Sequence, residues 1–540
     1  MAEKFNRATF TRNFLKNITR IKNPDEMLAD AKESNLEKTL GVWDLIILGV
    51  GAIIGSGIFA VVGIAAAGAA DGSSLGAGPA LVVSMIIAAI ACVFSALCYS
   101  EFATMIPVAG GAYTYTFATL GEFAAWMVGW VLMLEYAIGF IAVACSWSNY
   151  LMQFFKLFEN VLPSWLTNPP IWLTKDVFTV MDSLKDNPNI TVPQLFGIPI
   201  CINIPAIFIV LLMTAILVKG TKDTAKMAGI MVFIKLAVIF LVIGVGTFSF
   251  AHVPPHWLPF DAHTFAPNGW GGIFAGAFLI FFAYIGFDAL ATVAEECKNP
   301  QKDLPTGIIG SLFVTTIVYV LVALVLTGMV NTAGAVPGSF LDAPMVYCMK
   351  LLNHDGLACL ISVGSLAGLT SVLLVLEMAA TRILYAMSRD HFISKRFQKI
   401  HPKFKTPALL TWTVGGLAVL GILTLNLNVA AELCNYGTFT SFIIVCLAVL
   451  ILRHTDPDRP RPFKVPFSPL LPILGIVCCG GLMVYKSMEA GSSALLFPVW
   501  LGVGAIIYLL YGFIRNRDNE NKLHRELVHD ITKQQNESNN

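Results

Sequence analysis

The stretch GVGAIIGSGIFAVVG, residues 49–63, decides the fold of this 540-residue chain. Five glycines interrupt an otherwise apolar run, although each glycine costs about 1 kcal/mol relative to alanine in a helix interior. One interpretation is a face of small residues against which a second helix packs. We favour a helix that unwinds at Gly55, Ser56 and Gly57, because a break inside a membrane is tolerated where it lines a cavity or is buried in protein.

The composition of the chain indicates a membrane protein. Hydrophobic residues make up 56% of the sequence and charged residues 13%, whereas a soluble domain usually carries about 25% charged residues. A membrane-spanning helix needs about 20 apolar residues. Twelve segments approach this requirement, and the predicted spans are 43–70, 79–106, 121–155, 201–218, 226–248, 271–296, 305–330, 357–388, 408–425, 430–452, 471–487 and 496–515.

The distribution of positive charge predicts the orientation of these spans. If both termini are cytosolic, 28 of the 35 Lys and Arg residues fall in cytosolic segments and 5 in outside segments. Positive residues are enriched in cytosolic loops, so we expect an all-α, multi-pass cell-membrane protein with cytosolic termini. Segment 107–120 is expected to form an interfacial helix on the cytosolic side, and segment 156–200 to fold over the outer mouth.

The sixth predicted span contains a counterpart to the first. It reads GAFLIFFAYIGFDAL, residues 276–290, with Gly286 in its middle and Asp288 shortly after. An ionisable residue inside a membrane is a functional-site hypothesis by default. Spans one and six occupy matching positions if the chain comprises two inverted repeats of five helices plus two further helices. Interruptions at matching positions are the best sequence indication of a transport site.

Two broken helices predict a site with two electrically distinct ends. A second half-helix begins with free amides and a positive dipole end, which attract a carboxylate. A first half-helix ends in free carbonyls, which accept hydrogen bonds from an ammonium group. This combination suits an amino acid. The predicted site comprises the break at Gly55, the amides of Ser56 and Gly57, and the carbonyls of Ile53, Ile54, Phe282, Ala283 and Ile285.

Three further charged residues inside predicted spans bear on function. Lys235 follows Lys226 by about 13 Å along a helix and is deep for snorkelling to the surface, so we expect it to carry a coupling proton, to act as a permanent cation or to form a structural ion pair. Glu135 is equally compatible with a functional role and an ion pair. We expect Glu377 to pair with Arg382 rather than to line the inner vestibule.

Three strings now resemble a known family: GVGAIIGSGIF at 49–59, FFAYIGFDALATVAEE at 281–296 followed by KNPQKDLP, and TRILYAMSRD at 381–390. They are similar to the amino acid–polyamine–organocation (APC) superfamily, and within it to the cationic amino acid transporter family and its bacterial proton-coupled relatives. The likeness covers about residues 38–515. It implies a leucine-transporter-type fold of two inverted five-helix repeats that works by alternating access.

The resemblance also implies roles for individual residues. The substrate's α-amino and α-carboxylate groups would bind at the breaks in spans one and six. Lys235 matches a span-five lysine that takes the place of a sodium ion, and Glu135 matches an acidic residue of span three; both would serve proton coupling. The implied organisation is a cytosolic tail 1–42, repeat one 43–248, repeat two 249–452, two further helices in 453–515 and a cytosolic tail 516–540.

The expected activity is proton-coupled symport of small neutral amino acids, because Ile53, Ala283 and Ile285 are small or apolar. Transport of cationic amino acids stays open if Glu377, a position uncharged in the relatives, faces the pocket. Exchange of two amino acids is a second alternative. A membrane-embedded enzyme would need a catalytic His–acid cluster or a metal site, and the nine His residues include no HExxH pattern.

The expected partners are the amino acid, the proton and the lipid bilayer. We expect no cofactor, no metal and no nucleic acid. A channel is disfavoured because no filter-like sequence occurs. The sequence does not decide between a monomer and an oligomer.

Overall fold

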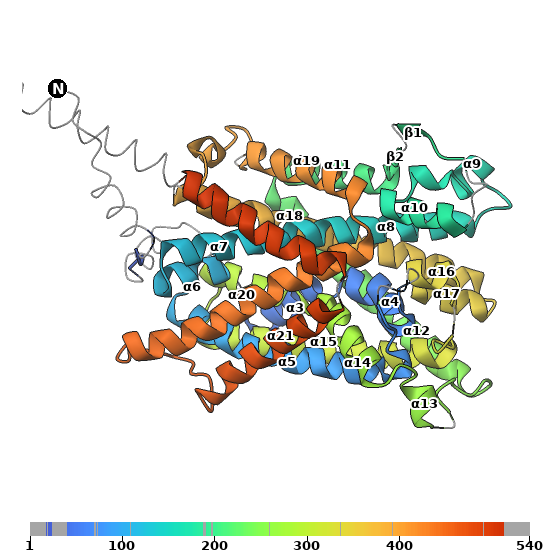
Figure 1. The fold of residues 1–540 in the computed structure, drawn as a ribbon, viewed down its shortest axis with the longest axis horizontal. Coiled ribbons are helices and arrows are strands. Elements are labelled where there is room, and N and C mark those ends of the chain that lie inside the picture. The colour runs from blue at the N-terminus through green and yellow to red at the C-terminus, as the bar shows by residue number, and fades with distance from the viewer. Residues whose placement is uncertain are drawn as a thin grey trace, which may run out of the picture.

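The computed structural model of the protein describes residues 18, 20–23, 40–69, 72, 74–108, 110–186, 191–195, 198–258, 260–334, 336–390, 392–404, 406–489 and 491–511. The predicted C-terminal tail 516–540 lies outside these residues, as does most of the predicted tail 1–42. Figure 1 shows that the described part is a bundle of long helices. Its one departure from the all-α expectation is a short antiparallel hairpin, β1 (Gln194–Leu195) and β2 (Ile198–Pro199).

The twelve predicted spans all correspond to helices within the described ranges. Nine helices there are long and apolar enough to cross a membrane, and the bent pair Val42–Ile53 and Gly57–Ala67 forms a tenth span. Two further apolar helices are shorter, namely α11 (Ile204–Lys219) and α19 (Ala408–Thr424). The fold is therefore that of a multi-pass membrane protein.

The first half of the bundle contains spans one to five. They consist of α3 (Val42–Ile53), the π-helical turn Gly57–Val61 and α4 (Val62–Ala67); the 3-10 turn Gly78–Ala80 and α5 (Leu81–Met105); α7 (Glu122–Met133), the π-helical turn Leu134–Ile138 and α8 (Gly139–Lys156); α11; and α12 (Thr221–Ser249).

The second half and the last two spans follow. They consist of α14 (Gly269–Ile280) with the 3-10 helices Phe281–Tyr284 and Asp288–Glu296; α15 (Pro300–Met329); α18 (Asp355–Arg389); α19; α20 (Leu427–Thr455); α21 (Leu470–Met488); and Ser492–Tyr511. Short helices connect the spans: α6 (Gly111–Thr119), α9 (Ser164–Thr167), Ile171–Leu173, α10 (Val177–Asp186), α13 (Ala262–Phe265), α16 (Gly338–Asp342), α17 (Pro344–Leu351) and Lys395–Gln398.

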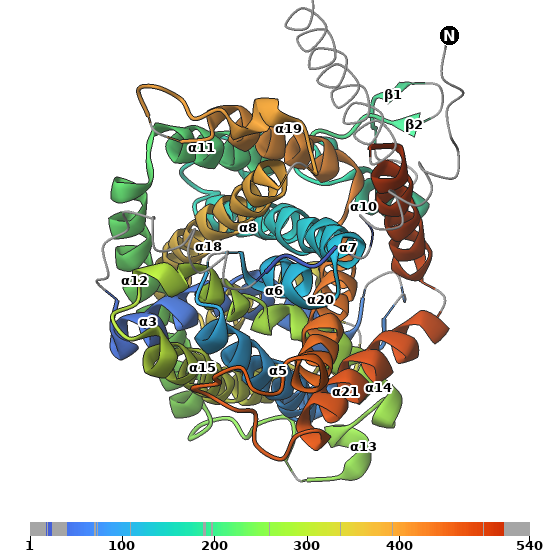
Figure 2. The ribbon, with the colours of Figure 1, turned by 90° about the vertical axis from the view of Figure 1, so that its left-hand side faces the viewer.

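The packing between helices repeats in the two halves. In span one α3 packs on α15 of span seven, and in span six α14 packs on α5 of span two. Likewise α12 packs on α18, and α20 packs on α8. When each span number is raised or lowered by five, the contact of span one with span seven becomes that of span six with span two, and the contact of span five with span eight becomes that of span ten with span three. Two inverted five-helix repeats are expected to give this correspondence. Figure 2 shows α11 and α19, the matching fourth and ninth spans, side by side on the rim.

The outer helices present large apolar side chains to the surroundings. Phe233 and Phe240 of α12, Phe313 of α15, and Leu417 and Leu420 of α19 are each more than half exposed. A water-soluble protein rarely exposes such continuous apolar surface. A lipid bilayer is the medium that these faces suit.

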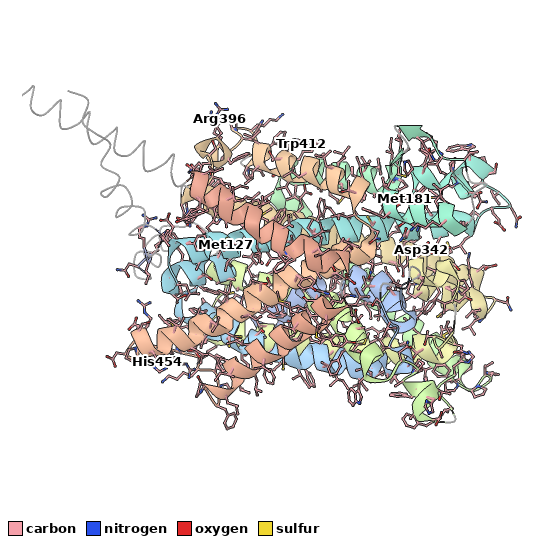
Figure 3. The ribbon with its side chains drawn as sticks, in the orientation of Figure 1. Met127, Met181, Asp342, Arg396, Trp412 and His454 are labelled. Atoms are coloured by element: carbon pink, nitrogen blue, oxygen red, sulfur yellow. The ribbon has the colours of Figure 1, made fainter. Side chains whose placement is uncertain are left out.

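The two ends of the bundle differ in the segments that they carry. Figure 3 places Arg396 and His454 at one end, called the inner end, and Met181 and Asp342 at the other, called the outer end after the predicted orientation. Segment 156–200 folds into α9, α10 and the hairpin at the outer end. There Lys175 Nζ lies 2.8 Å from Asp342 Oδ1 of α16, so this segment lies against α16, and its place over the outer mouth stays a prediction.

The predicted helix within 107–120 forms, but its expected place at the interface is wrong. All nine residues of α6 are buried, and the helix packs on α7 and α20. The Tyr113 hydroxyl donates a hydrogen bond to Asp390 at 2.7 Å. An uncharged, semi-apolar segment suits either an interface or a protein interior, and tertiary contacts select the interior here.

Candidate functional site

The first span is broken where its glycines predict. Helix α3 ends at Ile53, and Ile54 adopts an extended backbone with φ −70° and ψ 102°. The helix resumes after Ser56, and its two parts are bent by 47°. The amides of Ser56 and Gly57 lie in the first turn of the second half-helix, where that half-helix supplies no preceding carbonyl to accept from them. The break therefore presents backbone donors inside the bundle.

The sixth span is interrupted at Ile285 and Gly286. Gly286 has φ 123°, a conformation that favours glycine, and a Cβ there would lie 2.9 Å from the Ala52 carbonyl oxygen. Asp288 holds this break in place. Its Oδ1 accepts from the Gly286 amide at 3.2 Å, and its Oδ2 accepts a hydrogen bond from the Tyr136 hydroxyl of span three. The intramembrane aspartate thus fastens the break to a neighbouring span.

The two breaks are in direct contact. A Cβ on Gly57 would lie 2.3 Å from Ala283 Cα, so only glycine allows this approach of the two backbones. Tyr319 of α15 bridges them, since its hydroxyl lies 2.8 Å from the Ala283 carbonyl oxygen and 3.1 Å from that of Ile53. Span seven therefore ties the ends of both first half-helices together.

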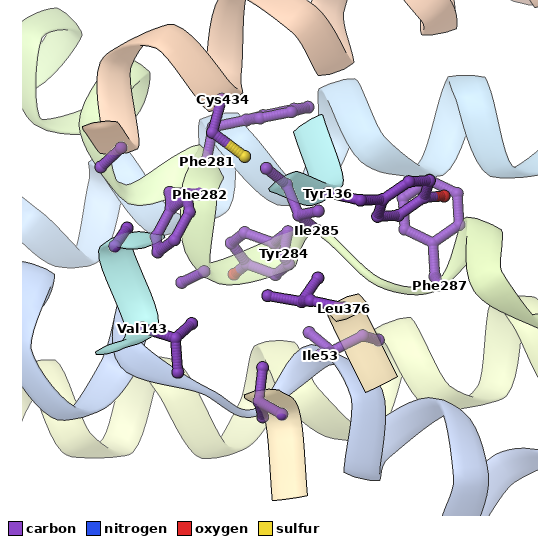
Figure 4. Packing of buried hydrophobic residues seen from close by; sticks show 14 of the residues in the cluster. Ile53, Tyr136, Val143, Phe281, Phe282, Tyr284, Ile285, Phe287, Leu376 and Cys434 are labelled. Atoms are coloured by element: carbon purple, nitrogen blue, oxygen red, sulfur yellow. The ribbon is translucent and has the colours of Figure 1, made fainter. Parts of the chain in front are cut away.

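A small cavity, here named the central cavity, lies between the breaks. Only about 20 Å³ of it is open to the centre of a water molecule, enough for about one water. Figure 4 shows apolar side chains converging there from spans one, three, six, eight and ten. The lining residues are Ala52, Ile53, Gly55, Ser56, Gly57, Glu135, Gly139, Val143, Phe282, Ile285, Val372, Leu376 and Cys434.

Two polar atoms in this lining are buried without a hydrogen-bond partner among the described residues. They are Ser56 Oγ, next to the free amides, and Glu135 Oε1 on the facing span. Buried polar groups are nearly always paired in folded proteins. An unpaired hydroxyl and an unpaired carboxylate oxygen on one cavity therefore indicate a place for a polar ligand.

Lys235 is fully buried and does not snorkel to either surface. Its Nζ donates to the carbonyl oxygens of Gly51 and Ile54, the latter at 2.7 Å, and to Ser371 Oγ of α18 at 3.3 Å. The ammonium group thus lies at the C-terminal end of α3, where carbonyls are free and the helix dipole is negative. It joins spans one, five and eight behind the central cavity.

Glu135 lies in the π-helical turn of span three, a feature often found at functional sites. Its Oε2 accepts from Ser441 Oγ at 3.4 Å, and its backbone carbonyl accepts from the Cys434 thiol at 3.0 Å. Neither Glu135 nor Lys235 forms an ion pair with any described residue. The purely structural ion pairs considered from the sequence are therefore not observed in that part of the chain.

The expected pair between Glu377 and Arg382 is wrong. Thr214 of α11 donates to Glu377 Oε1 at 2.5 Å, and Arg382 is exposed and lines a separate cavity at Leu48 and Ala289. Five residues correspond to about 140° of rotation around an α-helix, so the two side chains point apart. Glu377 also does not line the central cavity.

The structure brings most predicted site residues together. Seven line the central cavity, whereas Ile54, Ala283 and Lys235 lie directly behind it. The residues that the sequence interpretation missed come from spans one, three, seven, eight and ten: Ala52, Gly139, Val143, Tyr319, Val372, Leu376 and Cys434. A lone apolar residue in an apolar span carries no signal. Gly139 could have been predicted, because it follows Glu135 by about one helical turn and therefore lies on the same face of the helix.

Comparison with known proteins identifies the family. Residues 40–513 match the amino acid permease family. The chain is 39% identical over 498 residues to the branched-chain amino acid permease BcaP of Bacillus subtilis (strain 168), covering 92% of this chain and 97% of that protein. It is 38% identical over 493 residues to the methylthioribose transporter of the same organism, with 91% and 97% coverage.

A plant relative extends this set. The chain is 33% identical over 485 residues to cationic amino acid transporter 9, chloroplastic, of Arabidopsis thaliana, covering 88% of this chain and 78% of that protein. These relatives are transporters and not enzymes. By the extent of the family match and by these identities, the chain belongs to the amino acid permease family of membrane transporters.

Proposed function

We propose that this chain is a proton-coupled symporter of small neutral amino acids that works by alternating access. The observation that carries the proposal is the central cavity. It combines an end of backbone amides at Ser56 and Gly57 with an acceptor end at Glu135 and the span-six carbonyls. An amino acid is the common metabolite class with a carboxylate and an ammonium group on one carbon.

The substrate carboxylate would accept from the Ser56 and Gly57 amides and from Ser56 Oγ. The ammonium group would donate to the carbonyls of Phe282 and Ile285 and to Glu135. The carbonyls of Ile53 and Ala283 already accept from Tyr319 but keep a second lone pair. The carbonyl of Ile54 serves Lys235 instead.

The side chain of the substrate would lie against apolar walls. Val143, Val372 and Leu376 line the cavity opposite the breaks, which supports aliphatic substrates. Because Glu377 points away, it supplies no charge for a cationic side chain. A relative named branched-chain amino acid permease is consistent with this preference.

The central cavity must enlarge before an amino acid fits. Space for about one water is far smaller than the 300 Å³ or more of a usual ligand pocket. Binding would therefore require the half-helices of spans one and six to separate from their neighbours. We propose the repeats 43–248 and 249–452 as the moving units, with 453–515 added outside them.

Proton coupling is proposed to act through Lys235 and Glu135. The Lys235 ammonium holds the end of α3 to spans five and eight. Loss of its proton would remove a positive charge and at least one donor from that end of the half-helix. Glu135 lines the cavity, so its ionisation would alter the charge that the substrate meets.

We further propose residence in the cell membrane with both termini cytosolic. The support is the 28-to-5 bias of Lys and Arg in the sequence. In addition, Arg20 near the N-terminus pairs with Glu122 at 3.0 Å, and Lys22 pairs with Asp390 at 3.2 Å. Asp390 lies six residues before Arg396 in the sequence, and Figure 3 places Arg396 and His454 at the inner end.

The test is uptake of radiolabelled leucine into proteoliposomes with an inward proton gradient and no internal substrate. The expected result is accumulation that collapses when a protonophore removes the gradient. Uptake that requires preloaded amino acid would establish exchange instead. Gradient-independent equilibration would overturn proton coupling.

Competition by each of the twenty amino acids and by methylthioribose tests the substrate class. Aliphatic neutral amino acids are expected to compete best. Strong competition by arginine and lysine alone would overturn the neutral preference. Competition by methylthioribose alone would overturn amino acid transport, and this compound is included because a relative with 38% identity is a methylthioribose transporter.

A further inference from the structure

A second and much larger cavity, here named the outer cavity, lies at the outer end of the bundle. Its volume is about 480 Å³, which falls within the usual range for small-molecule sites. Its walls come from α4, α8, α10, α16 and the start of α20. Figure 1 shows these elements gathered at that end, and Figure 3 labels Asp342 there.

The outer cavity is aligned with the central cavity. On α8, Val143 lines the central cavity and Asn149 lines the outer one. Six residues of α-helix span about 9 Å, so the two spaces are separated by less than two turns of one helix. Tyr150 of α8 donates a hydrogen bond to the Phe59 carbonyl of span one at 2.5 Å, and neither residue lines either of the two cavities. A substrate that leaves the outer cavity inward meets the central one.

The outer cavity carries charges of both signs on one wall. Lys175 Nζ donates to Asp342 Oδ1 at 2.8 Å and to Asn149 Oδ1 at 2.9 Å. The neighbouring Asp176 is buried and accepts from the amide and hydroxyl of Thr179. An ammonium group has three donors and a carboxylate about four acceptor positions. Lys175 can therefore donate a further hydrogen bond, and Asp342 and Asp176 can accept further ones.

The pair between Lys175 and Asp342 is suited to exchange. Their side chains are 23% and 29% exposed, and ion pairs in contact with water contribute little to stability. A ligand with one carboxylate and one ammonium group can replace the single ion pair between Lys175 and Asp342 by two, one to each side chain. A simple anion would face the carboxylates of Asp176 and Asp342, and a simple cation would face Lys175 and Lys185, which also lines the cavity. The wall therefore favours a zwitterion over either ion.

From this arrangement we propose that the outer cavity is a second amino acid site. The α-carboxylate of the ligand binds Lys175, displacing Asp342, and the α-ammonium group binds Asp342 or Asp176. This inference rests on the proposed function and adds a weaker external site in front of the central one. The ligand class is an α-amino acid with any side chain that the 480 Å³ space holds.

Occupancy of this site has a consequence for access. Asp342 is the last residue of α16, and α16 packs on α4, on the turn Gly57–Val61 and on α8. A Cβ on Gly63 would lie 2.9 Å from the Phe340 carbonyl oxygen, so α16 rests closely on the second half of span one. When the ligand takes Lys175, α16 keeps its packing on α4, on the turn Gly57–Val61 and on α8, so binding in the outer cavity leaves the cover over the route to the central cavity in place.

The test uses Lys175→Gln in the full chain, with Lys156→Gln as the matched control. Lys156 is an exposed lysine at the outer end of α8 and does not line the cavity. The external KM for leucine uptake is expected to rise about tenfold in Lys175→Gln, with Vmax and the internal KM for efflux unchanged. Lys156→Gln is expected to match the wild type.

Asp342→Asn distinguishes a binding site from a latch, which here means that the Lys175–Asp342 pair only holds segment 156–200 against α16. A binding site predicts that this variant also raises the external KM, whereas a latch alone predicts faster uptake and efflux in both variants. Equal kinetics in Lys175→Gln and Lys156→Gln, or the latch pattern, would overturn the proposal while leaving leucine transport established. If the wild type transports and binds no amino acid, the proposed function itself is overturned, and the outer site with it.

Discussion

Replacing Lys235 by methionine removes the ammonium group while keeping an unbranched side chain of similar length. A volume-conserving exchange usually costs less than about 1.5 kcal/mol in packing. The larger loss comes from the carbonyls of Gly51 and Ile54, which both accept from Lys235 Nζ. Hydrogen bonds to a charged group contribute about 1.5–3 kcal/mol each, so this arrangement of the half-helix is weakened by roughly 3–6 kcal/mol.

Arginine at the same position provides the complementary variant. Its guanidinium group keeps the charge and the donors, but it cannot release a proton in a protein. The larger side chain costs about 1–3 kcal/mol in a packed interior. If Lys235 is the coupling group, Lys235→Met imitates a permanently unprotonated state and Lys235→Arg a permanently protonated one. Both variants are expected to lose proton-driven accumulation, and Lys235→Met is expected to be the less thermally stable.

The assay compares accumulation with exchange in the same proteoliposomes. One proton per substrate supports up to about tenfold accumulation for each pH unit of gradient, since a factor of ten corresponds to 1.4 kcal/mol. The wild type is expected to approach this ratio and both variants to stay near equality of inside and outside concentrations. Leucine–leucine exchange reports whether each variant is folded and binds substrate. A wild-type accumulation ratio in either variant would refute the role of Lys235 in coupling.

Three further outcomes follow from the site. Gly57→Ala is expected to abolish transport, because its Cβ would lie 2.3 Å from Ala283 Cα. Gly244→Ala is the control, because Gly244 has open space around it, and it should leave the initial uptake rate unchanged. Wild-type uptake in Gly57→Ala would contradict the contact of the two breaks. Glu377→Gln is expected to keep the order of competing amino acids, and a shift between neutral and cationic substrates would place this carboxylate in the pocket. Tyr319→Phe removes the one hydroxyl donor that the buried carbonyls of Ile53 and Ala283 share, at about 1–3 kcal/mol. A raised KM and a lower melting temperature are expected, and unchanged values would show that the bridge is dispensable.

The breaks in spans one and six could be predicted because membrane helices have few ways to expose backbone. Gly57 and Gly286 are the residues that the geometry requires, one for a backbone contact and one for φ 123°. Their glycines therefore signal the break directly. The distribution of Lys and Arg indicates which side of the membrane each loop occupies, and the orientation of the bundle stays a prediction.

Other features depend on partners distant in the sequence and could not be predicted. Thr214 donates a hydrogen bond to Glu377, 163 residues later in the sequence, and no pattern in either span predicts this pair. The burial of α6 depends on its contacts with α7 and α20. The apolar walls of the cavity, such as Val143 and Leu376, differ from other apolar residues only by their position in three dimensions.

The electrostatics of the central site give the reason to expect a zwitterion. The second half-helix of span one contributes about half a positive charge at its amide end, and α3 contributes about half a negative charge at its carbonyl end. A protonated Lys235 lies against that carbonyl end, and an ionised Glu135 on the facing wall nearly balances the total. A zwitterion then enters without changing the net charge, whereas a cationic substrate adds an uncompensated charge in a medium where burial is costly. When Glu135 carries a proton, the site is positive and excludes a second cation more strongly still. The proposed proton coupling follows the same reasoning: if Lys235 lost its proton, the negative carbonyl end of α3 would be uncompensated, and the contacts that hold this half-helix to spans five and eight would weaken.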